Sequence, residues 1–160
     1  MAITVLFVCT GNSCRSVMAQ GLLQHRLKQL QHHLHEPVEV ASAGVFAIEG
    51  MSASRDTVAV LTPVGIDVSG HMARMLTNDM IREADHIFVM EPTHFEEVVQ
   101  RVPEAMPKTH LLRTYEVAPG LADAEVAIPD PIGKPREVYE ACLAMIQEAI
   151  ERIAKRLVGA

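Results

Sequence analysis

Continuous apolar runs alternate along this chain with segments in which apolar residues recur every three or four positions. The run at 3–8 is rich in β-branched residues and is typical of a parallel strand that is covered on both faces. From residue 16 through Leu34 the apolar positions follow the period of a helix, which is expected to end before Pro37. The pattern also predicts strands at 38–43, 86–90 and 109–112, and helices at 53–62, 77–84, 93–101 and from residue 135 onward.

Strands that alternate with helices indicate an α/β fold, in which an open parallel sheet carries helices on both faces. Thr93 and Glu96 have the spacing of a capping box, which predicts the start of the helix that leads to Arg101. The segment 115–133 lacks a clear period, so we expect a long loop of the kind that is often functional. A length of 160 residues is natural for a single domain that spans 1–160.

The composition argues against several classes of partner. A net charge of −6 with no compensating basic run disfavours nucleic acid, and no segment reaches the roughly 20 apolar residues that a membrane span requires. Three cysteines are too few for a disulfide scaffold, which favours a cytoplasmic location. His32, His33 and His35 cluster with only Glu36 nearby, so a solvated helix end is favoured over a metal site, and no cofactor is expected.

The stretch that follows the first strand carries the clearest chemistry. Cys9 and Arg15 enclose a loop without proline, so every residue there keeps a backbone N–H that could face a phosphate-sized anion. Gly11 and Asn12 both tolerate the positive φ that turns amides inward. Arg15 would bind two phosphate oxygens as a planar fork, and the same positive field would favour the nucleophilic thiolate of Cys9. The predicted phosphate-binding loop comprises Thr10, Gly11, Asn12, Ser13, Cys14 and Ser16.

Neither Cys9 nor its spacing to Arg15 is enough by itself to predict a phosphate-binding site. A lone cysteine at the end of a buried strand usually belongs to the core, and a Cys-x5-Arg spacing recurs by chance. Gly11 and Asn12, together with a Ser16 hydroxyl that could hydrogen-bond the thiolate, favour a phosphate-binding nucleophile over that simpler explanation.

The segment 8–16 resembles the signature of the low-molecular-weight protein tyrosine phosphatases, including their bacterial protein-arginine phosphatase branch. Ser42-Ala43-Gly44, His71-Met72-Ala73-Arg74 and Asp130-Pro131 follow in the family's order and spacing, so the resemblance spans nearly the whole chain. It implies the strand order 2-1-3-4. One departure is Val17, which stands where the family usually has a proline that pre-sets the first helical turn.

The resemblance also implies a hydrolysis in two displacements. Cys9 attacks phosphorus to form a cysteinyl-phosphate, and water then releases phosphate. Arg15 and the loop amides stabilise the equatorial oxygens, where charge accumulates. Asp130 would protonate the leaving group from a backbone stiffened by the prolines on either side. Asp-Pro is also a common turn dipeptide, and Asp123 is a weaker candidate for the acid.

Further roles come from the same resemblance. Asn12, Ser16, Ser42 and His71 are expected to form a hydrogen-bond network under the loop. A reversible Cys9–Cys14 disulfide would protect the nucleophile from over-oxidation, although Cys14 could equally be a small buried side chain. Cys142 is expected in the core, on the apolar face of the last helix.

Three residues bear on the substrate: Ser13, Phe46 and Ile132. Tyrosine-specific members of the family typically have an apolar residue at the position of Ser13 and an aromatic residue just after the Asp-Pro pair. The arginine-phosphatase branch instead has a threonine at the first position, and a hydroxyl suits a polar guanidinium better than a phenyl ring. We therefore favour phosphoarginine on proteins over phosphotyrosine, and we expect the loop to bind a phosphate or sulfate ion.

Two other functions compete with this interpretation. Arsenate reductase would use the same anion site, but its disulfide relay needs further cysteines, and the region after the third strand contains none apart from Cys142. A non-catalytic phosphate or phosphoprotein sensor would bind without turnover, yet thiol, arginine and acid are all retained.

Overall fold

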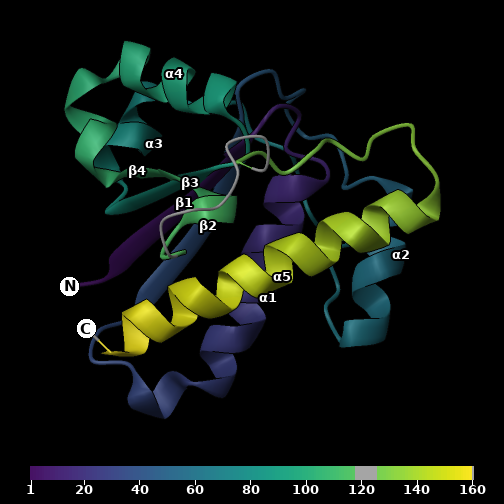
Figure 1. The fold of residues 1–160 in the computed structure, drawn as a ribbon, viewed down its shortest axis with the longest axis horizontal. Coiled ribbons are helices and arrows are strands. Elements are labelled where there is room, and N and C mark those ends of the chain that lie inside the picture. Colours follow the sequence, from purple (N-terminus) through teal and green to yellow (C-terminus); the bar gives the residue numbers. More distant parts are fainter. Residues whose placement is uncertain (118–125, 160) are drawn as a thin grey trace.

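The computed structural model describes residues 1–117 and 126–159 (Figure 1). Its strands and α-helices are β1 Ile3–Cys9, α1 Arg15–Gln29, β2 Val38–Gly44, α2 Arg55–Leu61, α3 Asn78–Glu83, β3 His86–Val89, α4 Pro92–Arg101, β4 Thr109–Leu111 and α5 Arg136–Gly159. Short 3-10 helices lie at Gln31–His33, Thr62–Val64, Pro103–Lys108 and Leu112–Thr114. Within the described part of the chain, no helix has both the length and the apolar character needed to cross a bilayer.

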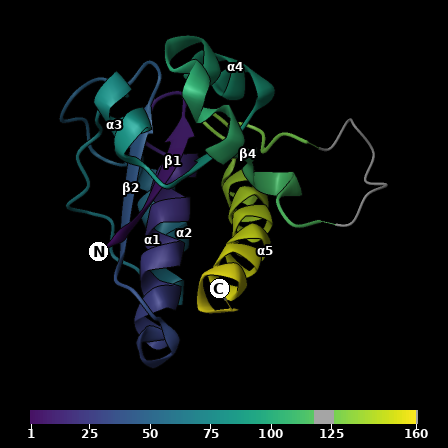
Figure 2. The ribbon, with the colours of Figure 1, turned by 90° about the vertical axis from the view of Figure 1, so that its left-hand side faces the viewer.

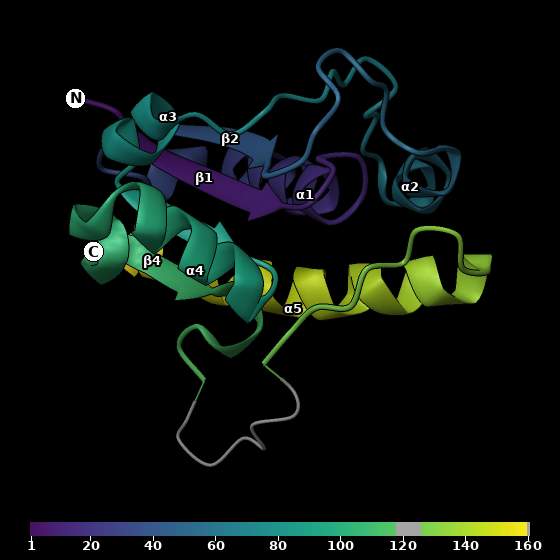
Figure 3. The ribbon, with the colours of Figure 1, turned by 90° about the horizontal axis from the view of Figure 1, so that it is seen from above.

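The strands form one parallel sheet in the order β2-β1-β3-β4, as predicted. Figure 1 labels all four strands, and Figure 3 shows β1 beside β2. Val5 of β1 is opposite Val40 on one side and His86 on the other, and Ile87 is opposite Thr109. β1 is therefore flanked by strands on both edges, and its last five residues are buried. This position explains why the first apolar run of the chain is continuous.

Helices cover both faces of the sheet (Figure 2). Successive side chains of a strand point to opposite faces, and β1 follows this rule. Val5, Phe7 and Cys9 belong to the core cluster formed with α1 and α5, whereas Leu6 and Val8 belong to the cluster formed with α3 and α4. The two layers of helices confirm the predicted α/β architecture.

The end of the first helix and the N-cap of α4 differ from the prediction. The first helix ends at Gln29, and the chain tightens into a 3-10 turn because the Leu30 N–H donates to the carbonyls of both Arg26 and Leu27. The prediction that Thr93 and Glu96 form a capping box was wrong. Glu91 is the N-cap residue of α4, since Pro92 suits the first helical position, where no N–H is required.

The carboxyl ends of β1, β2 and β3 meet at one edge of the sheet, where the chain carries its chemistry. Gly44, the last residue of β2, bridges to Met75. The loops that contain these residues are joined further out, because the Gly50 N–H donates to Ala73 O and the Ala73 N–H donates to Met51 O. The phosphate-binding loop therefore rests against two connected loops.

Candidate active site

Cys9 lies at the carboxyl end of β1, buried, at the foot of the predicted phosphate-binding loop. Asn12 has a φ of 53°, the left-handed conformation expected for a loop that turns its amides inward, whereas Gly11 does not have a positive φ. As a result, the Asn12 N–H donates to the Cys9 Sγ at 3.3 Å. α1 begins directly after the loop, at Arg15.

The Ser16 hydroxyl lies 2.9 Å from the Cys9 Sγ. Its oxygen accepts a hydrogen bond of 2.8 Å from the Asn12 Nδ2. Because the serine oxygen accepts from the amide, its own hydrogen can be donated to the sulfur. This arrangement stabilises the thiolate, the form of cysteine that acts as a nucleophile.

Asn12 forms hydrogen bonds with residues from several other segments of the chain. Its Nδ2 also donates to Ser42 Oγ at 2.9 Å, and its Oδ1 accepts from the Arg74 backbone N–H at 2.9 Å. The His71 Nε2 donates to the backbone carbonyl of Asn12 at 2.8 Å. The structure thus brings together Asn12, Ser16, Ser42 and His71, and these contacts hold Asn12 in its left-handed conformation.

Arg15 is 2% exposed, and protein groups fix its guanidinium. Its Nη1 donates to Glu91 Oε2 at 2.6 Å and to Ile128 O at 2.8 Å. Its Nη2 lies 3.5 Å from Thr10 Oγ1 and 3.7 Å from Asp130 Oδ2. Glu91 was not among the residues predicted for the site, although it follows β3 at the edge where ligands of parallel sheets bind.

Asp130 lies next to Arg15, with its side chain 41% exposed. Its Oδ1 accepts from the Ile132 N–H at 3.1 Å, which orients the carboxylate. Asp123, the weaker candidate for the acid, lies outside the described residues.

The three residues assigned to substrate selection occupy different positions around the loop. Phe46 and Ile132 are 78% and 56% exposed, and Ser13 is buried within the loop. The Phe46 N–H donates to Thr10 O at 2.9 Å, and the Ser54 N–H donates to Ser13 O at 3.0 Å. The loop that carries Phe46 is therefore anchored to the phosphate-binding loop at two points.

The three cysteines differ in environment. Cys9 and Cys14 are free thiols, so the reversible pairing of these two residues stays a prediction. The Cys14 Sγ lies 3.3 Å from Ser54 Oγ. Burial raises the pKa of Cys142 to about 12, because the core disfavours the thiolate. Cys142 belongs to the core cluster that contains residues of α1 and α5, as the helical pattern predicted.

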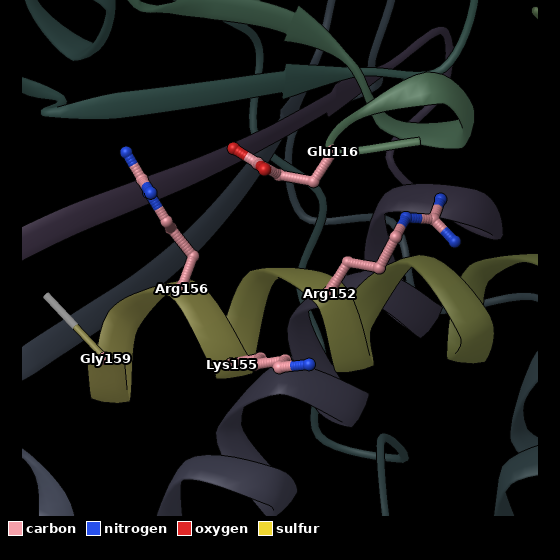
Figure 4. Close-up of a pocket in the computed structure, with 5 residues that line it drawn as sticks. All are labelled: Glu116, Arg152, Lys155, Arg156 and Gly159. Atoms are coloured by element: carbon pink, nitrogen blue, oxygen red, sulfur yellow. The ribbon is translucent and has the colours of Figure 1, made fainter. Parts of the chain in front are cut away.

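Gly44, at the end of β2, lies directly against the phosphate-binding loop. A Cβ at this position would be 2.5 Å from the Thr10 carbonyl oxygen and 2.9 Å from the Asn12 nitrogen. Gly44 belongs to the tripeptide Ser42-Ala43-Gly44 noted in the sequence, but its close contact with the loop is visible only in the structure. By contrast, a surface pocket of about 360 Å³ lies beside the last turns of α5 and is lined by Glu116, Arg152, Lys155, Arg156 and Gly159 (Figure 4). None of these five residues belongs to the site around Cys9.

A buried thiol at the foot of an amide-rich loop, on an open parallel sheet of this order, defines a phosphate-handling enzyme of the α/β class. The family model described as low molecular weight phosphotyrosine protein phosphatase matches residues 4–159. A protein-arginine-phosphatase of Geobacillus stearothermophilus is 40% identical over 157 residues, which cover 98% of this chain and 97% of that protein. The chain belongs to the low-molecular-weight phosphotyrosine protein phosphatase family and is a cysteine-type protein phosphatase.

Two solved structures are informative about the site. A YwlE arginine phosphatase mutant with a phosphorylated active-site serine has a TM-score of 0.85 and 28% identity, covering 97% of this chain and 95% of that chain. The tyrosine phosphatase Wzb from Escherichia coli K30, solved in complex with sulphate, has a TM-score of 0.81 and 29% identity, covering 98% of this chain and 99% of that chain. The family therefore includes both substrate classes considered above.

Proposed function

We propose that this phosphatase hydrolyses phosphoarginine residues of proteins in preference to phosphotyrosine. The observation that carries the proposal is the serine at position 13, a hydroxyl residue within the phosphate-binding loop. A site that offers a hydroxyl discriminates in favour of a polar guanidinium and gains little from a phenyl ring. The similarity to a protein-arginine-phosphatase along nearly the whole chain supports the same choice.

The first displacement forms a sulfur–phosphorus bond. The Cys9 thiolate attacks phosphorus while the bond from phosphorus to the guanidinium nitrogen breaks, and Asp130 gives its proton to the departing nitrogen. Arg15 and the backbone amides of the loop stabilise the equatorial oxygens of the transferring group. The position of Asp130 supports this role: its Oδ2 lies 3.7 Å from the Arg15 Nη2, beside the group that would bind the phosphoryl oxygens, and its side chain is 41% exposed, so a leaving group could reach it.

The second displacement regenerates the enzyme. Asp130, now a carboxylate, takes a proton from a water molecule, whose oxygen attacks phosphorus. The sulfur–phosphorus bond breaks, and the Ser16 hydroxyl, 2.9 Å from the sulfur, stabilises the departing thiolate. Inorganic phosphate is the product, and no cofactor enters either step.

Phosphotyrosine is the second candidate substrate. Phe46 favours it, because this exposed aromatic side chain stands on a loop bonded to Thr10 and could pack against a phenyl ring. However, Ile132 stands just after Asp130-Pro131, where tyrosine-specific relatives place an aromatic residue, so only one side of the ring would be covered by an aromatic group.

A comparison of two peptide substrates tests the proposal. We expect kcat/KM to be higher for a phosphoarginine peptide than for a phosphotyrosine peptide of the same sequence. Ser13→Ile should shift the ratio toward phosphotyrosine by about 10-fold, because it replaces the hydroxyl with an apolar group. Ser13→Thr is the matched control, since it keeps the hydroxyl and should keep the ratio. A ratio that Ser13→Ile leaves unchanged would contradict the proposal.

We also propose that residues 1–160 act as a single domain in the cytoplasm. A reducing compartment keeps Cys9 as a thiol, the state that the reaction requires. The same loop should bind free phosphate or sulfate as a competitive inhibitor, because each reproduces the oxygens of the substrate.

A further inference from the structure

His94 occupies a buried position in the first turn of α4 that the mechanism above does not use. Its side chain is 3% exposed. Its Nδ1 accepts a hydrogen bond of 3.2 Å from the Glu91 backbone N–H, and its Nε2 lies 2.9 Å from Thr10 Oγ1. His94 therefore links the start of α4 to the residue next to Cys9.

These two contacts determine which nitrogen carries the proton. Because Nδ1 accepts from a backbone N–H, a neutral ring must have its hydrogen on Nε2, which then donates to Thr10. The ring is neutral at physiological pH, since burial and the charge of Arg15 lower the pKa of His94 to about 4, against the opposing effects of Glu91 and Asp130.

The Thr10 hydroxyl oxygen accepts from two donors. One is the His94 Nε2, and the other is the Arg15 Nη2 at 3.5 Å. With both lone pairs engaged, the hydroxyl hydrogen is left for a third partner. Thr10 is only partly buried. Its hydroxyl lies beside the Arg15 guanidinium, the group expected to bind the phosphoryl oxygens, so its hydrogen can be directed toward the same oxygens.

We infer that His94 is a positioning residue that, through the Thr10 hydroxyl, aligns Thr10 and Arg15 as donors to the phosphoryl group. This role rests on the displacement at Cys9 proposed above and goes beyond it, because Thr10 becomes a substrate-contacting donor through its side chain as well as its backbone. Glu91 supports the arrangement twice, with its carboxylate on Arg15 and its N–H on His94.

The test is a double-mutant cycle measured with p-nitrophenyl phosphate at pH 7, so that it does not depend on whether arginine or tyrosine is the natural substrate. His94→Leu removes both ring contacts, and Thr10→Val removes the hydroxyl with little change in shape. Each should lower kcat/KM by about 10-fold, the size of one hydrogen bond to a charged transition state. The double variant should lose no more than either single variant, because both break one chain of contacts.

Rescue and control variants separate positioning from folding. His94→Gln keeps an acceptor and a donor on one planar group, and we expect it to retain kcat/KM within about 3-fold of the wild type. His110→Leu is the matched control: His110 on β4 is also partly buried, with a pKa lowered by burial and by His86, but it lies outside the site and should leave kcat/KM unchanged. The inhibition constant for vanadate should rise in parallel with the loss in kcat/KM.

The outcomes are distinct. Losses from His94→Leu and Thr10→Val that multiply in the double variant would overturn the inference, as would a His94→Leu enzyme that melts at a lower temperature but keeps its kcat/KM. If His94→Leu does not fold, Thr10→Val alone tests the inference, because full activity in that variant contradicts a donor role for the Thr10 hydroxyl. A wild-type chain that does not hydrolyse p-nitrophenyl phosphate would instead refute the proposed reaction.

Discussion

Replacement of Gly44 by alanine tests how tightly the sheet supports the phosphate-binding loop. Gly44 is the last residue of β2 and is opposite Cys9 in the sheet. The added Cβ would be 2.5 Å from the Thr10 carbonyl oxygen, 2.9 Å from the Asn12 nitrogen and 3.0 Å from the Gly11 carbonyl carbon. All three atoms belong to the backbone, so no side chain can rotate away to relieve the contact.

The size of the displacement follows from these distances. The Thr10 carbonyl must retreat by about 0.5 Å merely to reach 3.0 Å, the lower limit for real Cβ contacts. The same movement shifts the Asn12 N–H, which donates to the Cys9 Sγ. Because a misplacement of about 1 Å can cost roughly 100-fold in rate, we expect Gly44→Ala to lower kcat/KM by about 10- to 100-fold. The overpacking should also cost about 1–3 kcal/mol of unfolding free energy.

Steady-state kinetics with p-nitrophenyl phosphate and thermal melts would measure both effects. Gly70→Ala is the control, since a Cβ there meets nothing within 4 Å, and it should leave kcat/KM unchanged. A Gly44→Ala enzyme with wild-type kcat/KM and an unchanged melting temperature would show that the loop can move without loss. It would refute the argument that backbone contact with β2 holds the amides in place.

Three further outcomes are expected. Cys9→Ser should abolish turnover while vanadate or phosphate still binds, which calorimetry would detect; retained activity would mean that another group is the nucleophile. Asp130→Ala should lower kcat by about 10²- to 10⁴-fold, with a smaller loss for leaving groups that need no proton. His94 predicts a pH effect on stability: its pKa is about 4 when folded and about 6.5 when unfolded. The unfolded state then binds more protons between these values, so the unfolding free energy should fall by up to about 3 kcal/mol as the pH drops from 6.5 to 4. Denaturant titrations at several pH values would measure this fall, and His94→Gln should remove that component.

The continuous segment 9–16 could be interpreted from its residues because all its parts are neighbours in the chain. A nucleophile, a loop that keeps every amide and an arginine at its end need no distant partner to be recognised together. Both Gly11 and Asn12 tolerate positive φ, and in the structure Asn12 adopts it whereas Gly11 does not.

Helix starts show where local rules gave conflicting answers. Thr77 caps α3 and Ser54 caps α2, each through its side-chain oxygen, and both boundaries agree closely with the predicted ranges. At α4, Thr93 was predicted to be the N-cap residue of a capping box, but the N-cap is Glu91, because Pro92 favours the first helical position. Thr93 and Glu91, two residues apart, were both possible N-cap residues. The sequence pattern alone did not show which of them the helix would use.

The residue order of this chain was enough to predict an α/β fold and the loop between Cys9 and Arg15, because each depends on local period or on contiguous chemistry. Asp130 was selected as the candidate acid only through the resemblance of the chain to a known family, since Asp-Pro by itself is a common turn dipeptide. The contacts of Glu91, His94 and Gly44 with that loop could not be foreseen in the same way. Gly44 ends β2, whereas Glu91 and His94 follow β3 at the start of α4. These segments become neighbours of the loop after β1 because the parallel strands end at one edge of the sheet. The sequence determines which side chains are available, but which of them become neighbours is decided by how the strands pair.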